Sequence, residues 1–314
     1  MQLRQRARST AGFTLIEVML AMTLLMIVTG TVLQGMLDTV RANDVVNNRT
    51  DMHNGIRNAT ELLTQEVGQA GRLTLPAPVT TTAATAIAGT TLSVSSTAQM
   101  FVGEQLVVDS GVNQETVTVT AIPAATTLTV EPMDLAHANG VIVDVGGGFA
   151  AGVVPDNMVN GSSANRLKIF GDIHGTGSMV YIEYWCDLAN GRLYRNSMPM
   201  TQVGGVPAPT VEQVLIDNII ANPPAPNGVA PPCFTYQRQT VGGRTYITDV
   251  AITLTVQTQR IDPVTRRRAT ETKALLNVAP RNVFNVWQLA SLGVTNRIQP
   301  MPPSVTALIA TNPS

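Results

Sequence analysis

The sequence predicts an α+β fold, in which one long N-terminal helix packs on antiparallel β-sheet and a small β module is inserted between them. Three observations predict it. Residues 13–71 contain no proline and show helical apolar spacing, 76–145 are rich in Thr, Ala and Val, and 161–283 contain strand-like runs separated by turn residues. Because the helix precedes the strands, we expect its apolar face to lie across the sheet.

The first part of this helix is predicted to cross a membrane. The run 13–37 has 25 residues, which make about 37 Å of helix at ~1.5 Å per residue and can span a hydrocarbon core of roughly 30 Å. Arg4, Arg6 and Arg8 precede it without an acidic residue. The positive-inside rule therefore keeps residues 1–12 in the cytoplasm and sends the rest of the chain across.

Glu17 is the only charged residue in the apolar run, and a carboxylate there is costly unless it is paired. The small pair Ala11-Gly12 comes before the run, whereas the cleavage site of a secretory signal peptide follows one. Cleavage after Gly12 would remove only a leader, residues 1–12, and create an amine at Phe13. Glu17 could then pair with the amine of a neighbouring copy displaced along a helical stack. The alternative is an unprocessed signal anchor.

The segment Gly12-Phe13-Thr14-Leu15-Ile16-Glu17 resembles the processing and assembly motif of type IV prepilins and type II secretion pseudopilins. The resemblance implies that a membrane-embedded prepilin peptidase cuts after Gly12 and methylates Phe13. It also implies that Glu17 recruits the next subunit into a filament through that subunit's N-terminal amine. No cofactor or metal is expected.

The second part of the helix is predicted to pack on the head, because apolar residues recur there at helical spacing. That face comprises Val45, Met52, Ile56, Ala59, Leu63, Val67 and Ala70. The polar remainder of the helix is supplied by Asp38, Arg41, Asp44, Arg49, Asp51, Arg57, Glu61 and Glu66. Nothing forces a break before Gly68 and Gly71, so we expect one helix over 13–71.

Residues 76–145 are predicted to form an inserted β module of five or six short strands, with a small barrel as one arrangement. Segments 104–108 and 115–121 alternate as half-buried strands do. Residues 90–94, Thr-Thr-Leu-Ser-Val, recur as Thr-Thr-Leu-Thr-Val at 126–130; two similar edge strands are the plain explanation. A Gly-rich linker, 146–160, follows and is interpreted as a flexible hinge, because its glycine spacing does not suit a dinucleotide-binding loop.

The head, 161–283, is predicted to be antiparallel sheet, with an irregular Pro-rich loop at 222–232 that cannot lie in a central strand. The expected strands are 166–171, 178–187, 192–195, 211–220, 233–239, 246–259 and 269–278. Residues 284–314 are interpreted as a C-terminal tail.

Cys186 and Cys233 are the only cysteines. In a chain exported past the inner membrane they indicate one disulfide. It would close a loop of about 48 residues and stabilise the head by roughly 4 kcal/mol on the chain-entropy model. Metal binding or redox chemistry is the rival interpretation, which the absence of a CxxC spacing disfavours.

Segments around the cysteines extend the resemblance to minor pilins of the PilW type and, more distantly, to pseudopilin J of type II secretion. They are Tyr184-Trp185-Cys186, Gly191-Arg192-Leu193-Tyr194-Arg195, residues 214–219, Cys233-Phe234 and a strand end at 279–283. The resemblance implies a single-pass inner-membrane protein with a periplasmic head, later part of an extracellular pilus, at or near its tip. Implied partners are other minor pilins, the major pilin and a tip adhesin.

Composition and motifs disfavour an enzyme and a general nucleic-acid binder. The formal net charge is -1 and no HExxH or GxSxG motif occurs.

His53, His137 and His174 are expected to be ordinary surface histidines, and residues 109–115 are expected to form a hairpin turn. Arg266-Arg267-Arg268 is expected to alternate sides on a strand of a solvated hairpin. The alternative for these arginines is an anionic partner, either an acidic pilin surface or DNA, although DNA is not expected.

Two function classes follow. One is a structural minor pilin that primes assembly of a type IV pilus or, in the related system, a type II secretion pseudopilus. The other is a binding module on a pilin anchor, whose inserted β module recognises a surface, a glycan or DNA.

Overall fold

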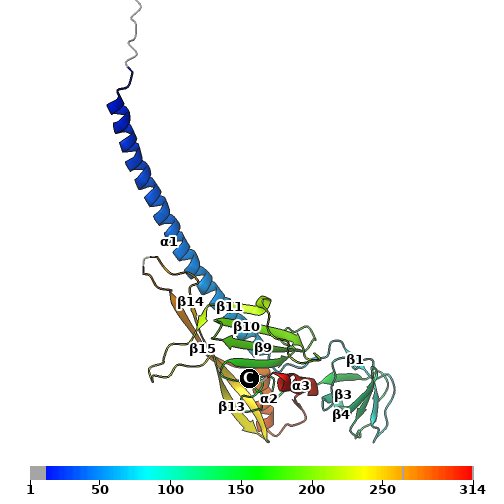
Figure 1. The fold of residues 1–314 in the computed structure, drawn as a ribbon. Coiled ribbons are helices and arrows are strands. Elements are labelled where there is room, and N and C mark those ends of the chain that lie inside the picture. Colours follow the sequence, from blue (N-terminus) through cyan, green and yellow to red (C-terminus); the bar gives the residue numbers. More distant parts are fainter. Residues whose placement is uncertain (1–11, 264, 313–314) are drawn as a thin grey trace, which may run out of the picture.

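The computed structural model describes residues 12–263 and 265–312, so most of the predicted leader lies outside the described residues. One helix, α1 (Leu15–Gln69), runs unbroken from the N-terminal end into the head. Its first half projects away from the rest of the molecule (Figure 1), and every described side chain up to residue 44 is exposed. The α+β fold class predicted from sequence is therefore confirmed.

The second half of α1 lies on two antiparallel sheets, as its apolar face predicted. Ile56, Ala59, Leu63 and Val67 are buried there, in one core that both sheets share. The first sheet has the order β11-β10-β9-β8, and in the second β14 is flanked by β12 and β13 on one side and by β15 on the other. The strands are β8 Arg166–Gly171, β9 Val180–Asp187, β10 Arg192–Pro199, β11 Val214–Asp217, β12 Ile219–Ile220, β13 Phe234–Val241, β14 Arg244–Gln257 and β15 Thr270–Val278.

The prediction of a single strand over 211–220 is wrong. A short 3-10 helix, η2 (Val211–Gln213), comes first, and the remainder divides into β11 and β12, which belong to different sheets. The residue between these strands, Asn218, has φ +62°, a left-handed conformation that asparagine tolerates better than most residues. This bend lets the chain leave one sheet and join the other.

Residues 79–145 form a closed, six-stranded barrel beside the head (Figure 1). The strand order is β1-β6-β3-β4-β5-β2. A bridge between Thr81 and Val94 joins the two outermost strands and closes the sheet. The two similar Thr-rich segments pair with each other, with Leu92 opposite Leu128, and both leucines are buried in the barrel core. The strands are β1 Val79–Thr80, β2 Thr91–Ser93, β3 Gln105–Val108, β4 Glu115–Ala124, β5 Thr127–Val130 and β6 Ile142–Val145; a 3-10 turn, η1 (Gly111–Asn113), links β3 to β4.

The flexible hinge expected at 146–160 is wrong, because most of this segment is packed into the head. Its strand β7 (Gly148–Phe149) pairs in parallel with β16 (Ile298–Gln299), and Phe149 and Val153 are fully buried. Glycine is needed here for close contact: a Cβ on Gly152 would lie 2.1 Å from the Cα of Gly71. The glycines therefore permit tight backbone packing rather than motion.

The C-terminal segment is folded onto the head. Helix α2 (Arg281–Ser291) begins where a strand end was expected at 279–283, so that expectation is wrong. Helix α3 (Pro303–Thr311) places Val305, Leu308 and Ile309 in a second core, with aromatic side chains from β8 and β9. Figure 1 shows α3 on the side of the head nearest the barrel.

Two hydrogen bonds between the side-chain amide of Gln299 and the backbone of Gln105 join the barrel to the head. The backbone N–H of Gln105 donates to Gln299 Oε1 at 2.9 Å, and Gln299 Nε2 donates to the Gln105 carbonyl at 2.8 Å. The rings of Phe101 and Phe149 meet beside it, with centroids 5.8 Å apart. The C-terminal segment, which supplies Gln299, thus helps to position the inserted module.

Candidate assembly site

The N-terminal end of α1 carries the candidate assembly residues on a fully accessible surface. Gly12 and Phe13 precede the first helical turn, and Phe13 is 87% exposed. Within the described part of the chain, α1 is the one helix long and apolar enough to cross a membrane. Because no head residue covers this end, a peptidase or a neighbouring helix can reach it.

Glu17 forms a capping box with Thr14, which the sequence analysis missed. The Thr14 backbone N–H and hydroxyl donate to Glu17 Oε2 at 2.9 and 3.0 Å, while the Glu17 N–H donates to Thr14 Oγ1 at 3.4 Å. The pattern [ST]-x-x-E at a helix start is a sequence signal for this arrangement. In the isolated subunit, the carboxylate is therefore oriented toward the N-terminal end of the helix.

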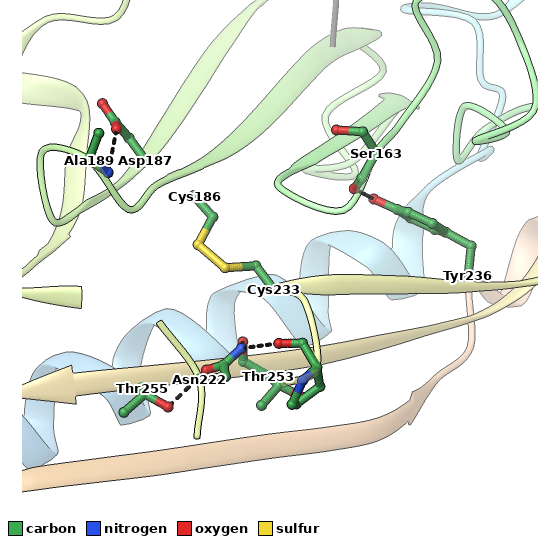
Figure 2. The surroundings of a disulfide bond; sticks show 10 residues. Ser163, Cys186, Asp187, Ala189, Asn222, Cys233, Tyr236, Thr253 and Thr255 are labelled. Carbon is green, nitrogen blue, oxygen red and sulfur yellow. Dashed lines mark hydrogen bonds between the residues drawn. A yellow bond between two sulfur atoms is a disulfide. The ribbon is translucent and has the colours of Figure 1, made fainter. Parts of the chain in front are cut away.

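A disulfide between Cys186 and Cys233 ties the two sheets of the head together (Figure 2). Cys186 lies on β9 of the first sheet, and Cys233 directly precedes β13 of the second. Tyr236, three residues later, donates its hydroxyl to the carbonyls of Ser163 and Arg166 at 3.0 and 2.8 Å. Burial raises the pKa of Tyr236 well above its usual value, so the hydroxyl stays a donor.

Asn222 holds the Pro-rich loop close to this disulfide. Its Nδ2 donates to the carbonyls of Thr253 and Pro231 at 2.9 and 3.0 Å, and its Oδ1 accepts from the Thr255 hydroxyl at 2.8 Å (Figure 2). Asn222 thus joins the start of the loop to β14 and to the other end of the loop at Pro231.

Glu66 is buried, although the sequence analysis placed it on the polar remainder of the helix. It accepts hydrogen bonds from the Arg195 guanidinium and the Tyr184 hydroxyl. Burial raises the pKa of Tyr184 and keeps its hydroxyl protonated. The position could have been recognised, because residue 66 lies three after Leu63 and four before Ala70, on the buried face.

A second buried charge cluster holds the end of the C-terminal segment and was also missed. Lys168 Nζ donates to the carbonyls of Asn312 and Asn160 at 2.6 and 2.9 Å. Asn312 Nδ2 donates to Glu183 Oε2 at 2.5 Å. Burial lowers the pKa of Lys168, and the neighbouring Glu183 carboxylate opposes that shift.

The three histidines have different surroundings in the structure. His53 of α1 pairs with Glu271 of β15, and His174 is exposed in a loop. His137 contradicts the expected surface position: it is buried in the barrel, with Nε2 2.5 Å from Glu115 and Nδ1 3.4 Å from Asp109. Among the described residues, no group of three or more His, Cys, Asp or Glu side chains could hold a metal ion.

Residues 7–33 match the prokaryotic N-terminal methylation motif. No curated protein and no solved structure is significantly similar to the chain. The matched segment covers the end of the leader, Gly12, Phe13, Glu17 and most of the apolar half of α1. The motif and the long apolar helix together support a type IV pilin-like subunit that is anchored in a membrane by a single span.

Proposed function

We propose that the protein is a minor pilin of a type IV pilus, of the PilW type, at or near the filament tip. It would wait in the inner membrane with its head in the periplasm, be cut after Gly12 and methylated at Phe13 by prepilin peptidase, and then prime assembly with other minor pilins. The observation that supports this most strongly is the helix end described above: an accessible Phe13 and a carboxylate at Glu17 on an uncovered apolar helix.

The assembly step follows from the geometry of Glu17. Within the described part of the chain, its carboxylate accepts only from Thr14, three residues away. When the helix enters a filament, the N-terminal amine of a neighbouring subunit can replace these hydrogen bonds with an ion pair. Pairing two opposite charges in an apolar filament core offsets the desolvation that either would suffer alone.

The size of the head supports a low-copy position. In the described part of the chain, two four-stranded sheets, a two-stranded sheet, two α-helices and a barrel follow α1, and the barrel extends to one side of the helix axis (Figure 1). A subunit repeated along a shaft must leave room for copies displaced by a small rise, which such a lateral extension obstructs. A tip subunit has no copy above it, so it can carry the barrel. There it could contact the major pilin below and a tip adhesin.

A second candidate function is a binding module carried on the same anchor. It is favoured by the loops of the barrel, where the side chains of Val112 and Ile87 are 95% and 67% exposed. Apolar side chains at loop tips are suited to contact with a surface, a glycan or another protein. We propose no catalytic role for either function.

Co-purification tests these alternatives. The soluble head, residues 42–314, is immobilised and offered the soluble heads of other minor pilins, of the major pilin and of type II secretion pseudopilins. We expect capture of minor pilins. Capture of pseudopilins alone would place the protein in a secretion pseudopilus, and capture of no pilin-like head would overturn the priming role.

A matched variant separates assembly from surface binding. Val112→Ser changes an exposed side chain at a loop tip of the barrel, outside the hydrophobic cores. We expect it to leave capture of minor pilins unchanged. If it abolished that capture, the barrel would be the pilin-binding surface, and if it abolished only binding to a host or abiotic surface, the binding-module function would gain support. Labelling of an epitope on the head should, in addition, mark filament ends and not shafts.

A further inference from the structure

The connection between β14 and β15 runs along α1 toward its membrane half (Figure 1). Asn48 of α1 is joined to it by two hydrogen bonds: its Nδ2 donates to the Arg260 carbonyl at 3.0 Å, and the Arg260 N–H donates to its Oδ1 at 3.4 Å. Arg49 forms an ion pair with Asp262 at 3.2 Å. These contacts fix the connection against the helix.

The far end of this connection lies at the level where α1 leaves the membrane. Pro263 lines one shallow cavity with Asp38, Arg41, Ala42 and Val45 of α1. Asp38 is the first residue after the apolar run, so residues 38–45 lie about 2–12 Å beyond it at ~1.5 Å per residue. The headgroup region adds roughly 5–7 Å to each side of the hydrocarbon core. The tip of the connection at Pro263 therefore lies at or just outside the headgroup layer when the helix spans a bilayer.

Arg266, Arg267 and Arg268 stand at this end, and they do not alternate on a strand as the sequence analysis expected. They precede β15 in a tight turn, in which the Arg266 N–H donates to the Asp262 carbonyl at 2.8 Å and the Asp262 N–H donates to the Arg267 carbonyl at 3.0 Å. Arg266 has φ +54°. The reason for the difference is that Arg266 and Arg267 are part of the turn itself and β15 begins only at Thr270, so the three arginines share one exposed end.

This end carries a concentrated positive charge. Residues 258–269 contain four arginines and one aspartate, a net charge of +3 in a chain whose net charge is -1. The three consecutive arginines are exposed, and no ion pair engages them within residues 12–263 and 265–312. Ile261, 59% exposed, adds an apolar side chain suited to the interface.

We infer that this basic turn, residues 260–263 and 265–268, binds anionic phospholipid headgroups of the leaflet on the head side of the membrane. Guanidinium groups bind phosphate through paired hydrogen bonds, and basic residues next to a membrane span are attracted to anionic lipid. The inference rests on the membrane anchoring of the proposed function, but not on pilus assembly. The contact would hold the head against the bilayer and be lost when the helix is extracted into a filament.

Hydrogen exchange on the full-length protein tests the inference. The protein is reconstituted into vesicles of phosphatidylcholine alone or with about one third phosphatidylglycerol. We expect the backbone amides of the turn to exchange about fivefold or more slowly in the anionic vesicles. The difference should vanish at about 1 M salt, where the Debye length falls to ~3 Å.

Three variants give the controls. The triple variant Arg266→Gln, Arg267→Gln, Arg268→Gln should lose the slowing, and the triple Lys variant at the same positions should keep most of it. Arg238→Gln, Arg281→Gln, Arg297→Gln removes the same charge from exposed sites elsewhere on the head and should keep all of it. Equal exchange in both kinds of vesicle, or slowing that survives the Gln variant, would overturn the inference. Slowing by duplex DNA but not by anionic vesicles would also overturn it, in favour of nucleic acid. Each result is independent of whether the protein enters a pilus.

Discussion

Glu66 near the end of α1 and Arg195 on β10 form a largely buried ion pair in which both carboxylate oxygens accept from the guanidinium. The Glu66 side chain is 4% exposed and that of Arg195 is 23% exposed. The pair joins the helix that carries the membrane anchor to the sheet that forms the head. It thereby fixes the direction in which the anchor leaves the head.

Removing one member of this pair should destabilise the head strongly. Glu66→Ala leaves Arg195 and the Tyr184 hydroxyl without their acceptor, and we expect a loss of about 3 kcal/mol in the free energy of unfolding. Urea unfolding of the detergent-solubilised protein measures it. The double variant Glu66→Ala, Arg195→Ala should lose less than the sum of the two single variants. Strict additivity would show that the two residues do not stabilise each other.

The stability of the barrel–head junction should depend on pH through Glu104. This residue is fully buried, and one of its oxygens accepts from the Phe101 N–H at 3.2 Å; the other has no hydrogen-bond partner among the residues that the structure describes. Burial raises the pKa of the Glu104 carboxyl to about 8. Since the unfolded chain titrates near its ordinary value, the folded state binds the extra proton between about pH 4.5 and 8.

Because the folded state binds more protons than the unfolded chain in this range, folding stability falls as the pH rises. The favourable contribution of the neutral carboxyl is complete below the unfolded pKa and is lost as the pH rises toward about 8. Wild-type protein should therefore lose stability relative to Glu104→Gln between pH 5 and pH 8, by about 1.4 kcal/mol per unit at most. Thermal unfolding of both proteins across this range measures the difference. A constant difference would mean that Glu104 is not protonated at neutral pH.

Reduction of the disulfide should weaken the contact between the two sheets. Cys186 and Cys233 are separated by 47 positions, and a loop of that length corresponds to about 4 kcal/mol of stabilisation on the chain-entropy model. Cys186→Ser, Cys233→Ser should lower the urea midpoint in non-reducing buffer, and reducing agent should then have no further effect. An unchanged midpoint would contradict a stabilising role.

The elements that could be predicted from sequence are those whose signal is local. The face of α1 repeats at helical spacing from Val45 to Ala70, and the alternating strands of the barrel show period two. The residues missed depend on contacts between distant segments. Gly152 lies so close to the backbone of Gly71 that it tolerates no side chain, and nothing local to 146–160 reveals that partner. Its glycines therefore suggested a hinge where the structure has tight packing.

Two features that were not predicted do have a local pattern in the sequence: helix α2 and the hydrogen bond between Thr14 and Glu17. Val283, Val286 and Ala290 are spaced three and four apart and are the buried face of α2, so the helix could have been predicted within the presumed tail. At the candidate site, the motif predicted Gly12, Phe13 and Glu17 because it is contiguous. The hydrogen bond of Thr14 to Glu17 required the spacing of a capping box to be considered as well. The basic turn could not be placed, because its position beside Asp38 depends on the length of β14.

Charge pairing at Glu17 should be separable from helix capping. Glu17→Ala removes both the charge and the acceptor for Thr14, whereas Glu17→Gln keeps a side-chain acceptor at the same position. If the ion pair with a neighbouring amine drives assembly, both variants should lower the amount of protein in filaments about tenfold or more, a free-energy change of about 1.4 kcal/mol. Immunoblots of sheared filaments and of membranes measure the two pools.

Cleavage provides the matched control, because the peptidase acts before Glu17 is needed. Glu17→Ala and Glu17→Gln should both reach the mature mass, with a methylated Phe13, while Gly12→Val should stay in the membrane at the precursor mass. Thr14→Val removes only the hydroxyl of the cap and should assemble normally. If Glu17→Gln also assembled normally while Glu17→Ala did not, the acceptor at position 17 would matter and its charge would not, so an ion pair with the neighbouring amine would not be the force that recruits the next subunit.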